Sequence, residues 1–180
     1  ENAMAVIALA QEGGFLNAPD VYMRKISTNT EDVSVVSLDQ DLKFNIIELA
    51  KFNKVNVEDL VICILDRERH NDEIEIIRST GARIKMINDG DVSAVISSVV
   101  TNSNIDMYYG IGGAPEGVLA AAALQCIGGT IEGQLLFNND DEIKRAKQTG
   151  IQNLDKIYKL NDLAQGDIMF SATGVTDGTM

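Results

Sequence analysis

Few residues of the kinds that build nucleophilic or zinc-binding sites are present in this sequence. Its 180 residues include one histidine, two cysteines, two prolines and no tryptophan. A histidine-rich zinc site is therefore excluded, and a Cys-His or Ser-His nucleophilic site would have to be built on His70 alone. Cys63 and Cys126 lie in apolar runs, with no CxxC pair or disulfide pattern. We interpret both as buried, inert thiols of a protein in a reducing compartment, the cytoplasm.

Basic residues and long apolar runs are scarce as well. Lys and Arg total 15 against 27 Asp and Glu, which gives a net charge of −12. Neither a nucleic acid nor a membrane is expected as a partner, because anionic surfaces need a basic stripe on the protein. The longest apolar stretch, 118–127, is too short to span a bilayer, and no secretion signal opens the chain. Most of the negative charge suits a solubilising surface, and it also suits carboxylates that hold divalent cations.

The two ends of the sequence suggest a piece of a longer protein. The chain opens at Glu1 without an initiator methionine, enters an apolar run at once, and stops at Met180 just after a glycine-rich turn. A strand at the first residues needs a neighbour, so we expect an N-terminal segment that is absent here. The 45% of apolar residues is enough for a core, and we interpret residues 1–180 as a single α/β domain fragment.

Short apolar runs alternate with helical patterns along most of the chain. The opening pattern is strand, turn, strand, in which Gly13-Gly14 is the turn and 15–19 follows it. Pro115 is well placed in the first turn of a helix, and Gly81 is expected to end one. The alternation predicts a layered α/β fold with a largely parallel or mixed sheet and helices on both faces. Strands are expected at 4–10, 61–65, 83–87, 105–109, 131–137, 156–160 and 167–172, and helices at 41–52, 71–80, 92–100, 115–127 and 140–149.

Four segments that follow predicted strands carry arginines, carboxylates and glycines. Ligands of an open parallel sheet bind beyond the carboxyl ends of its strands, so these segments are candidates for one site. Arg67 and Arg69 suit phosphate, because guanidinium presents a planar fork of donors. The alternative is that both pair with Asp66 or Glu73 on the surface. The segments are 66–70 (DRERH), 88–91 (NDGD), 110–117 (GIGGAPEG, a glycine-rich turn entering a helix) and 173–178 (TGVTDG).

Three carboxylates in these segments raise the question of a bound cation. Two carboxylates about 5 Å apart repel by roughly 3 kcal/mol at an effective dielectric near 20, so a cluster of Asp89, Asp91 and Glu116 needs arginine or a metal. Hard oxygen ligands of this kind prefer magnesium, manganese or calcium. The alternatives are that Asp89 or Asp91 caps the helix from Val92, and that the helix dipole alone favours Glu116.

A dinucleotide-binding fingerprint does not fit the glycine-rich segment. Gly110 and Gly112 match G-x-G, but Pro115 stands where the third glycine belongs, and no phosphate-loop lysine follows. With arginines and carboxylates on one edge and no usable nucleophile, the residues favour metal-assisted attack of water on a phosphate ester.

Six segments, in order, resemble the class II fructose-1,6-bisphosphatases of bacteria. The resemblance covers nearly the whole chain, and it implies an inositol-monophosphatase/fructose-bisphosphatase-like fold. The implied reaction is hydrolysis of the 1-phosphate of fructose 1,6-bisphosphate to fructose 6-phosphate, in gluconeogenesis and glycerol metabolism, with manganese or magnesium. Some members also cleave sedoheptulose 1,7-bisphosphate, and we expect a homo-oligomer. The segments are ENAMAVIALA, FLNAPDVYMRK, ILDRERH, INDGD, GIGGAPEGVLAAAAL and FSATGVTDG.

The resemblance also implies roles for particular residues. Glu116 would be a metal ligand. Catalytic residues are expected mostly in the absent N-terminal segment, which in the family carries further metal-binding carboxylates in a DPIDGT-like motif, so the fragment alone is expected to be nearly inactive. Glu68 departs from the family pattern, because it replaces a proline between the two basic positions of the turn. The residues implied to contact the sugar bisphosphate are Tyr22, Arg67, Glu68, Arg69, Asp89, Gly90, Asp91 and Gly113.

Two other functions remain as alternatives. One is a non-catalytic module that binds a sugar phosphate, and metal-independent binding without hydrolysis would favour it. The other is an inositol-phosphate or 3′-phosphonucleotide phosphatase, which comparative hydrolysis assays would separate from a fructose bisphosphatase.

Overall fold

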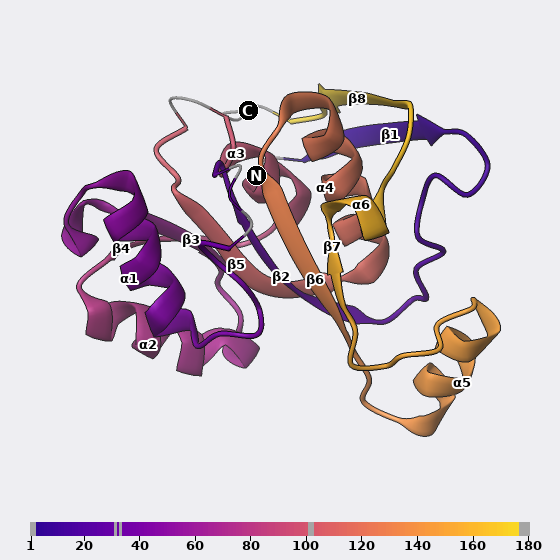
Figure 1. Cartoon of the computed structure of the whole chain (residues 1–180), viewed down its shortest axis with the longest axis horizontal. Helices are drawn as coiled ribbons and strands as arrows, with labels where there is room; N and C mark the ends of the chain where they lie inside the picture. Colours follow the sequence, from indigo (N-terminus) through magenta and orange to yellow (C-terminus); the bar gives the residue numbers. More distant parts are fainter. Residues whose placement is uncertain (1–2, 31, 33, 101–102, 177–180) are drawn as a thin grey trace.

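The computed structural model (Figure 1) describes residues 3–30, 32, 34–100 and 103–176. The strands in these ranges are β1 Met4–Ala10, β2 Tyr22–Thr28, β3 Val61–Leu65, β4 Arg83–Ile87, β5 Met107–Gly113, β6 Thr130–Leu136, β7 Ile157–Lys159 and β8 Ile168–Gly174. The helices are α1 Leu42–Asn53, α2 Asn71–Thr80, α3 Asp91–Ser97, α4 Ala114–Ile127, α5 Asp140–Gln148 and α6 Leu160–Leu163, with short 3-10 turns η1 Val57–Asp59 and η2 Glu68–His70.

The main sheet is mixed rather than purely parallel. Its strand order is β4-β3-β5-β2-β6-β7. β3 runs parallel to β4 and β5, whereas β2 is antiparallel to β5 and β6, and β7 is antiparallel to β6. The carboxyl ends of β3, β4 and β5 therefore meet at one edge, as the ligand-site argument requires. The predicted α/β class with a mixed sheet is confirmed.

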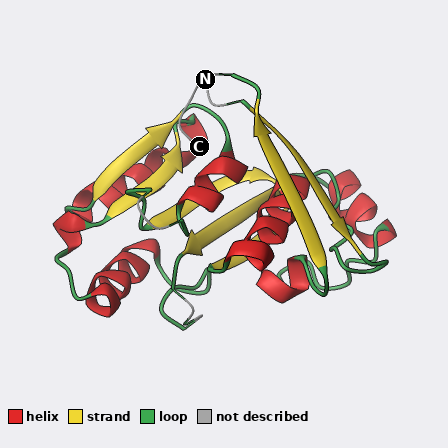
Figure 2. Ribbon diagram, turned by 90° about the horizontal axis from the view of Figure 1, so that it is seen from above, coloured by secondary structure: helices red, strands yellow, loops and turns green. Residues whose placement is uncertain are grey.

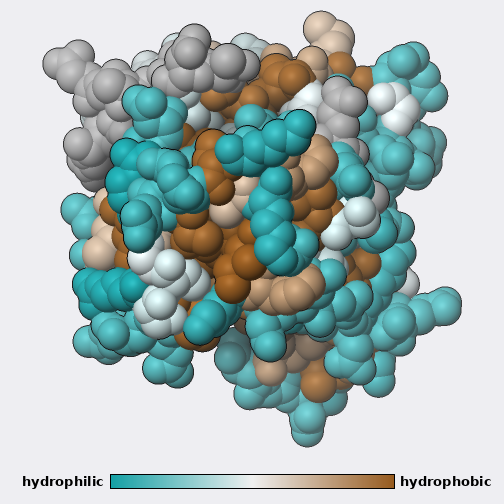
Figure 3. All heavy atoms as spheres, turned by 60° about the vertical axis from the view of Figure 1, so that its left-hand side comes forward, coloured by the Kyte–Doolittle hydropathy of each residue, from teal (hydrophilic) through white to brown (hydrophobic). Residues whose placement is uncertain are grey.

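Helices cover both faces of this sheet (Figure 2). Its strands alternate their buried side chains between two apolar cores. On one face Ile62 and Ile64 of β3 pack with α1 and α2, and on the other face Cys63 packs with α3 and α4. Figure 3 shows the side of α1 and α2 brought forward, with hydrophilic residues spread around apolar ones. The period-two alternation of a strand explains why one short apolar run serves both cores.

The first and last strands form a separate two-stranded sheet. β1 pairs with β8 antiparallel, and both contact α4, so this ribbon lies over the helix layer (Figure 1). The prediction of a buried strand at 4–10 is wrong in part, because Ile7 is 57% exposed and Leu9 is 55% exposed. Thr173 and Gly174 of the predicted segment thus end a strand of this ribbon and not of the main sheet, and Val175 and Thr176 follow it.

Three further expectations need correction. Residues 15–19 form no strand; Phe15 makes a single bridge to Ala164. The central strand β2 was not predicted, because YMRKIST shows neither an apolar run nor a regular alternation of polar and apolar residues. Cys63 is buried, and burial raises the pKa of its thiol to about 11, which confirms an inert thiol; Cys126, however, is exposed.

No helix in the described part of the chain is long and apolar enough to cross a bilayer.

Candidate functional site

The glycine-rich segment after β5 is the end of that strand and not a turn. Gly110 to Gly113 pair with β2, in a register that sets Gly113 opposite Tyr22 and Gly112 opposite Met23. α4 begins at the next residue, with Pro115 in its first turn. Antiparallel pairing with β2, a strand that the sequence analysis missed, keeps these glycines extended. The predicted turn is therefore wrong, although the predicted approach of this segment to a helix N-terminus is confirmed.

An acidic cavity lies beside the start of α4. It has a volume of about 370 Å³. Asp89, Gly90 and Asp91, which precede or begin α3, line it together with Glu116 from the first turn of α4. The remaining lining residues are Ala3, Met4, Val6, Val92, Ser93 and Leu119. Four of the nine residues predicted for the site thus share one cavity.

Lys25 of β2 is the residue that joins this cavity to the end of β5. Its side chain is 1% exposed, and its Nζ lies 2.5 Å from Asp91 Oδ2 and 3.0 Å from the carbonyl oxygen of Gly113. No side chain caps α3, so the capping alternative for Asp91 is wrong. Lys25 could not be recognised from the sequence, because a lysine on a strand is normally exposed. The only feature of the sequence that could have indicated its burial is its spacing of two from Met23 and Ser27. With Val21, these residues lie on one face of the strand, which is buried.

A second group lies at the same edge of the sheet. The Arg69 guanidinium stacks over the ring of Tyr22, 5.1 Å from its centroid. Arg69 Nε and Nη2 donate to the carbonyl oxygen of Ile111 at 3.1 and 2.8 Å. Tyr22 is 45% exposed and pairs with Gly113. Because strand side chains alternate, Tyr22 and Lys25 leave β2 on opposite faces, and the two groups meet at the sheet end near Gly113.

Arg67 and Glu68 join neither group. Both are exposed, and Arg67 Nη1 donates to the backbone oxygen of Asp66 at 3.0 Å. Among the described residues neither Arg67 nor Arg69 forms an ion pair with Asp66 or Glu73, so the surface-pair alternative is not what the structure shows. The structure therefore places Tyr22 and Arg69 beside the acidic cavity and leaves Arg67 and Glu68 on the adjoining surface.

His70 holds the two segments that carry Arg69 and the glycines. Its ring is fully buried; Nδ1 is 2.9 Å from the Leu65 carbonyl oxygen, and Nε2 accepts the Ile111 N–H at 2.8 Å. Because Ile111 N–H is a donor, the ring proton lies on Nδ1 and the imidazole is neutral. Burial is the main cause that lowers the pKa of His70. Both ring nitrogens are occupied, so His70 has a structural role and is not a catalytic base.

His70 gives a prediction for stability against pH. A pKa that is lower in the folded than in the unfolded chain means that unfolding takes up a proton. Stability is then complete above the ordinary pKa near 6.5 and is lost as pH falls through the folded pKa. Denaturant unfolding between pH 8 and pH 5 should show this loss, and His70→Gln, whose amide oxygen still accepts the Ile111 N–H, should lack it. An equal slope in both proteins would contradict the assignment.

The last predicted segment borders the same cavity. Val175 N–H donates to the Ala3 carbonyl oxygen at 2.8 Å, and Ala3 N–H donates to Thr176 Oγ1 at 3.0 Å. Because Ala3 lines the cavity, the segment from Thr173 to Thr176 lies at its border. Asp177 and Gly178, which complete the predicted segment, lie outside the described residues.

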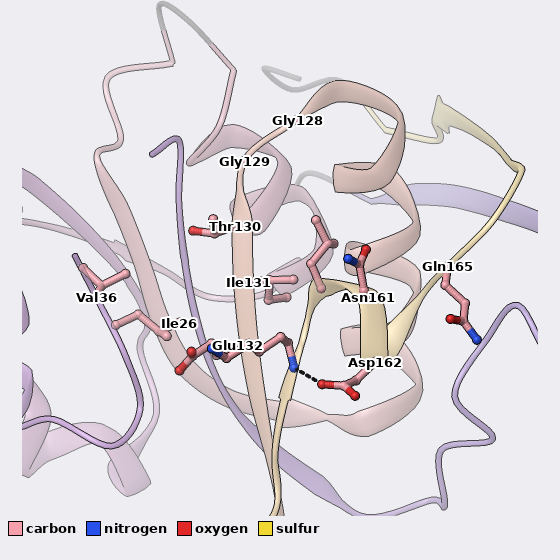
Figure 4. Close-up of a pocket in the computed structure, with 12 residues that line it drawn as sticks. Ile26, Val36, Gly128, Gly129, Thr130, Ile131, Glu132, Asn161, Asp162 and Gln165 are labelled. Carbon is pink, nitrogen blue, oxygen red and sulfur yellow. Dashed lines mark hydrogen bonds between the residues drawn. The ribbon is translucent and has the colours of Figure 1, made fainter. Parts of the chain in front are cut away.

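A larger cavity, of about 720 Å³, lies elsewhere (Figure 4). Its lining includes Ile26, Thr130, Glu132 and Asn161 but none of the predicted site residues. The register places the start of β6 level with Thr28, at the other end of β2 from Tyr22. At about 3.4 Å per residue, Thr28 lies about 20 Å along the strand from Tyr22. The larger volume therefore has no part in the candidate site.

The described residues include carboxylates of the type that bind a divalent cation, but too few of them lie together to hold one. They contain no group of three or more His, Cys, Asp or Glu side chains suited to holding one ion. Glu116 is exposed and makes no hydrogen bond or ion pair within the described ranges, so its carboxylate is available to a cation. Asp91 is committed to Lys25. Glu116 would thus be one ligand of a hard cation whose other ligands come from outside these residues.

Comparison with known proteins identifies the family of the chain. The chain matches, over residues 1–180, the family described as bacterial fructose-1,6-bisphosphatase, glpX-encoded. A relative from Trichodesmium erythraeum, named D-fructose 1,6-bisphosphatase class 2/sedoheptulose 1,7-bisphosphatase, is 39% identical over 99% of this chain and 55% of its own length. Proteins of the same name from Synechocystis and Gloeobacter violaceus are 38% identical with the same coverage. The chain spans about half the length of these relatives, and it belongs to the bacterial, glpX-encoded family of fructose-1,6-bisphosphatases.

Proposed function

We propose that the whole protein hydrolyses the 1-phosphate of fructose 1,6-bisphosphate to fructose 6-phosphate, and that sedoheptulose 1,7-bisphosphate is a second substrate. The observation that carries the proposal is the meeting of two groups at one sheet edge: the acidic cavity with Glu116, and the Arg69–Tyr22 pair beside Gly113. A phosphorylated sugar needs both, because its phosphate requires cationic donors and its hydroxyl groups require acceptors. Family membership supports the same substrate class.

Different residues of this chain would bind the phosphate, the sugar hydroxyl groups and the metal ion. Arg69 uses Nε and Nη2 on Ile111 and keeps the Nη1 donors for a phosphate oxygen. Asp89 and Asp91, at the N-terminal end of α3, are acceptors for sugar hydroxyl groups. Glu116 would hold a magnesium or manganese ion, which when bound supplies Lewis-acid stabilisation of the phosphoryl oxygens. The remaining ligands are proposed to come from the half of the relatives' length that this chain does not represent.

We further propose a cytoplasmic role in gluconeogenesis, as a homo-oligomer. The free thiols of Cys63 and Cys126 suit a reducing compartment.

The test is phosphate release by the full-length protein. Fructose 1,6-bisphosphate should yield one phosphate and fructose 6-phosphate, with activity lost in a chelator and restored by manganese or magnesium. Sedoheptulose 1,7-bisphosphate, an inositol phosphate and a 3′-phosphonucleotide are assayed beside it. A clear preference for either of the last two, or chelator-resistant turnover, would contradict the proposal, and tight binding of fructose 1,6-bisphosphate by calorimetry without any hydrolysis would favour a binding module.

Residues 1–180 alone are expected to turn over far more slowly than the full-length protein. The reason is that Glu116 is one ligand without its partners within the described residues. Circular dichroism and a thermal melt must first show that the segment is folded. Turnover by the folded segment at the full-length rate would contradict this account of the metal site.

A further inference from the structure

Lys25 is a buried cation whose two partners belong to different walls of the candidate site. It stands on the central strand β2, and its Nζ contacts Asp91, which begins α3, and the carbonyl oxygen of Gly113, which ends β5. The Asp91 side chain is itself only 13% exposed. One ammonium group therefore ties the Asp89–Asp91 loop to the strand end from which α4 and Glu116 begin.

Packing alone does not account for a lysine at this position. An ammonium group taken out of water is costly unless it is paired, and an apolar side chain fills a buried space without that cost. The same face of β2 carries Met23, which packs into the core beside α4. A second methionine would fill the position of Lys25, but it would leave Asp91 and the Gly113 carbonyl without their shared donor.

Two glycines lie beside the Lys25 side chain, where a larger residue would come too close to it or to its partner Asp91. A Cβ atom on Gly112 would collide with Asp91 Oδ2 and lie 3.1 Å from Lys25 Nζ. A Cβ atom on Gly117, one turn into α4, would lie 3.3 Å from Lys25 Cδ. Gly112 in β5 thus makes room for the Lys25–Asp91 pair, and Gly117 in α4 makes room first for Met23, whose Sδ would be 2.5 Å from the added Cβ, and then for the lysine stem.

We propose that Lys25 is a positioning residue, which acts on the substrate through Asp91 and Gly113. Its ammonium group fixes the Asp91 carboxylate and the Gly113 carbonyl at one spacing, and so sets the distance between the Asp89–Asp91 loop and the start of α4. The proposal rests on the proposed function, in which Asp91 binds the sugar bisphosphate. Lys25 itself is not required to touch the substrate.

The test compares three variants of the full-length protein. Lys25→Met keeps the length of the side chain and removes its donors. We expect KM for fructose 1,6-bisphosphate to rise about 10-fold to 100-fold with kcat much less affected, because a binding contact common to ground and transition state is weakened. Gly112→Ala, which pushes the Asp91 carboxylate away without removing the Lys25 ammonium group, should raise KM in the same way and is informative even if Lys25→Met fails to fold. Leu49→Ala, a buried position of α1, is the control that destabilises the fold without touching the site.

Unchanged KM in folded Lys25→Met or in Gly112→Ala would overturn the inference, as would an equal rise in Leu49→Ala. Crystal structures of wild type and variant give a readout that does not depend on turnover. The Asp91 carboxylate should leave its place beside Gly112 in Lys25→Met or Gly112→Ala; if it stays, Lys25 does not position it. Failure of the wild type to hydrolyse fructose 1,6-bisphosphate would refute the proposed function instead, and the crystal comparison would still decide the role of Lys25.

Discussion

Glu116→Gln in the full-length protein is expected to lower phosphate release by about 100-fold to 1000-fold, equivalent to about 3–4 kcal/mol of barrier. Glu116 is the carboxylate of the acidic cavity that makes no ion pair or hydrogen bond among the described residues. The amide keeps the size of the side chain and loses the charge that a divalent cation requires. The fold should be unaffected, because the side chain is exposed in the first turn of α4.

The measurement is kcat against manganese concentration, together with a thermal melt. Glu116→Gln should need far more manganese for half-maximal activity, while its Tm stays near that of the wild type. Asp140→Asn is a matched control, because Asp140 is also an exposed carboxylate in the first turn of a helix, α5. Wild-type kinetics at limiting manganese in Glu116→Gln would remove Glu116 from the metal site.

The acidic cavity could be predicted from the sequence, because segments that follow parallel strands come together at one edge of the sheet. Strands β3, β4 and β5 were predicted from short apolar runs, and their parallel arrangement brings the segments behind them to one edge. Asp89, Asp91 and Glu116 meet there for that reason. The helices α2 and α4 were also predictable, because Gly81 and Pro115 mark an end and a beginning.

The role of Lys25 was not predictable in this way. Whether a lysine on a strand is buried depends on what packs against both faces of that strand, and only the pairing of β2 between β5 and β6 decides this. The same pairing explains why Gly110 to Gly113 form strand instead of turn. Local propensity favours a turn for such glycines, and tertiary hydrogen bonding overrides it. The exposed outer face of β1 was missed for a related reason, since an apolar sequence does not reveal which face is covered.

The second large effect is expected for Gly113→Ala, which should lower activity about 100-fold with little loss of stability. A Cβ atom at this position would collide with Glu116 Oε2 and lie 2.9 Å from Glu116 Cδ. The backbone itself accepts alanine, because Gly113 has φ −63° and ψ 145°, an ordinary extended conformation. The exposed carboxylate therefore moves, and a displacement of about 1 Å in a catalytic group costs about 100-fold in rate.

A combined measurement of kcat, manganese dependence and Tm tests this prediction. Gly113→Ala should resemble Glu116→Gln in its manganese requirement, and the double variant should be little worse than either single variant, because both changes act on one carboxylate. Gly128→Ala is not a suitable control, since Gly128 has φ 92° and alanine there would be strained. Asp140→Asn serves again as the control, because Asp140 is an exposed first-turn residue of α5 that does not line the acidic cavity. Additive losses in the double variant would show that Gly113 acts on the reaction by a route other than Glu116.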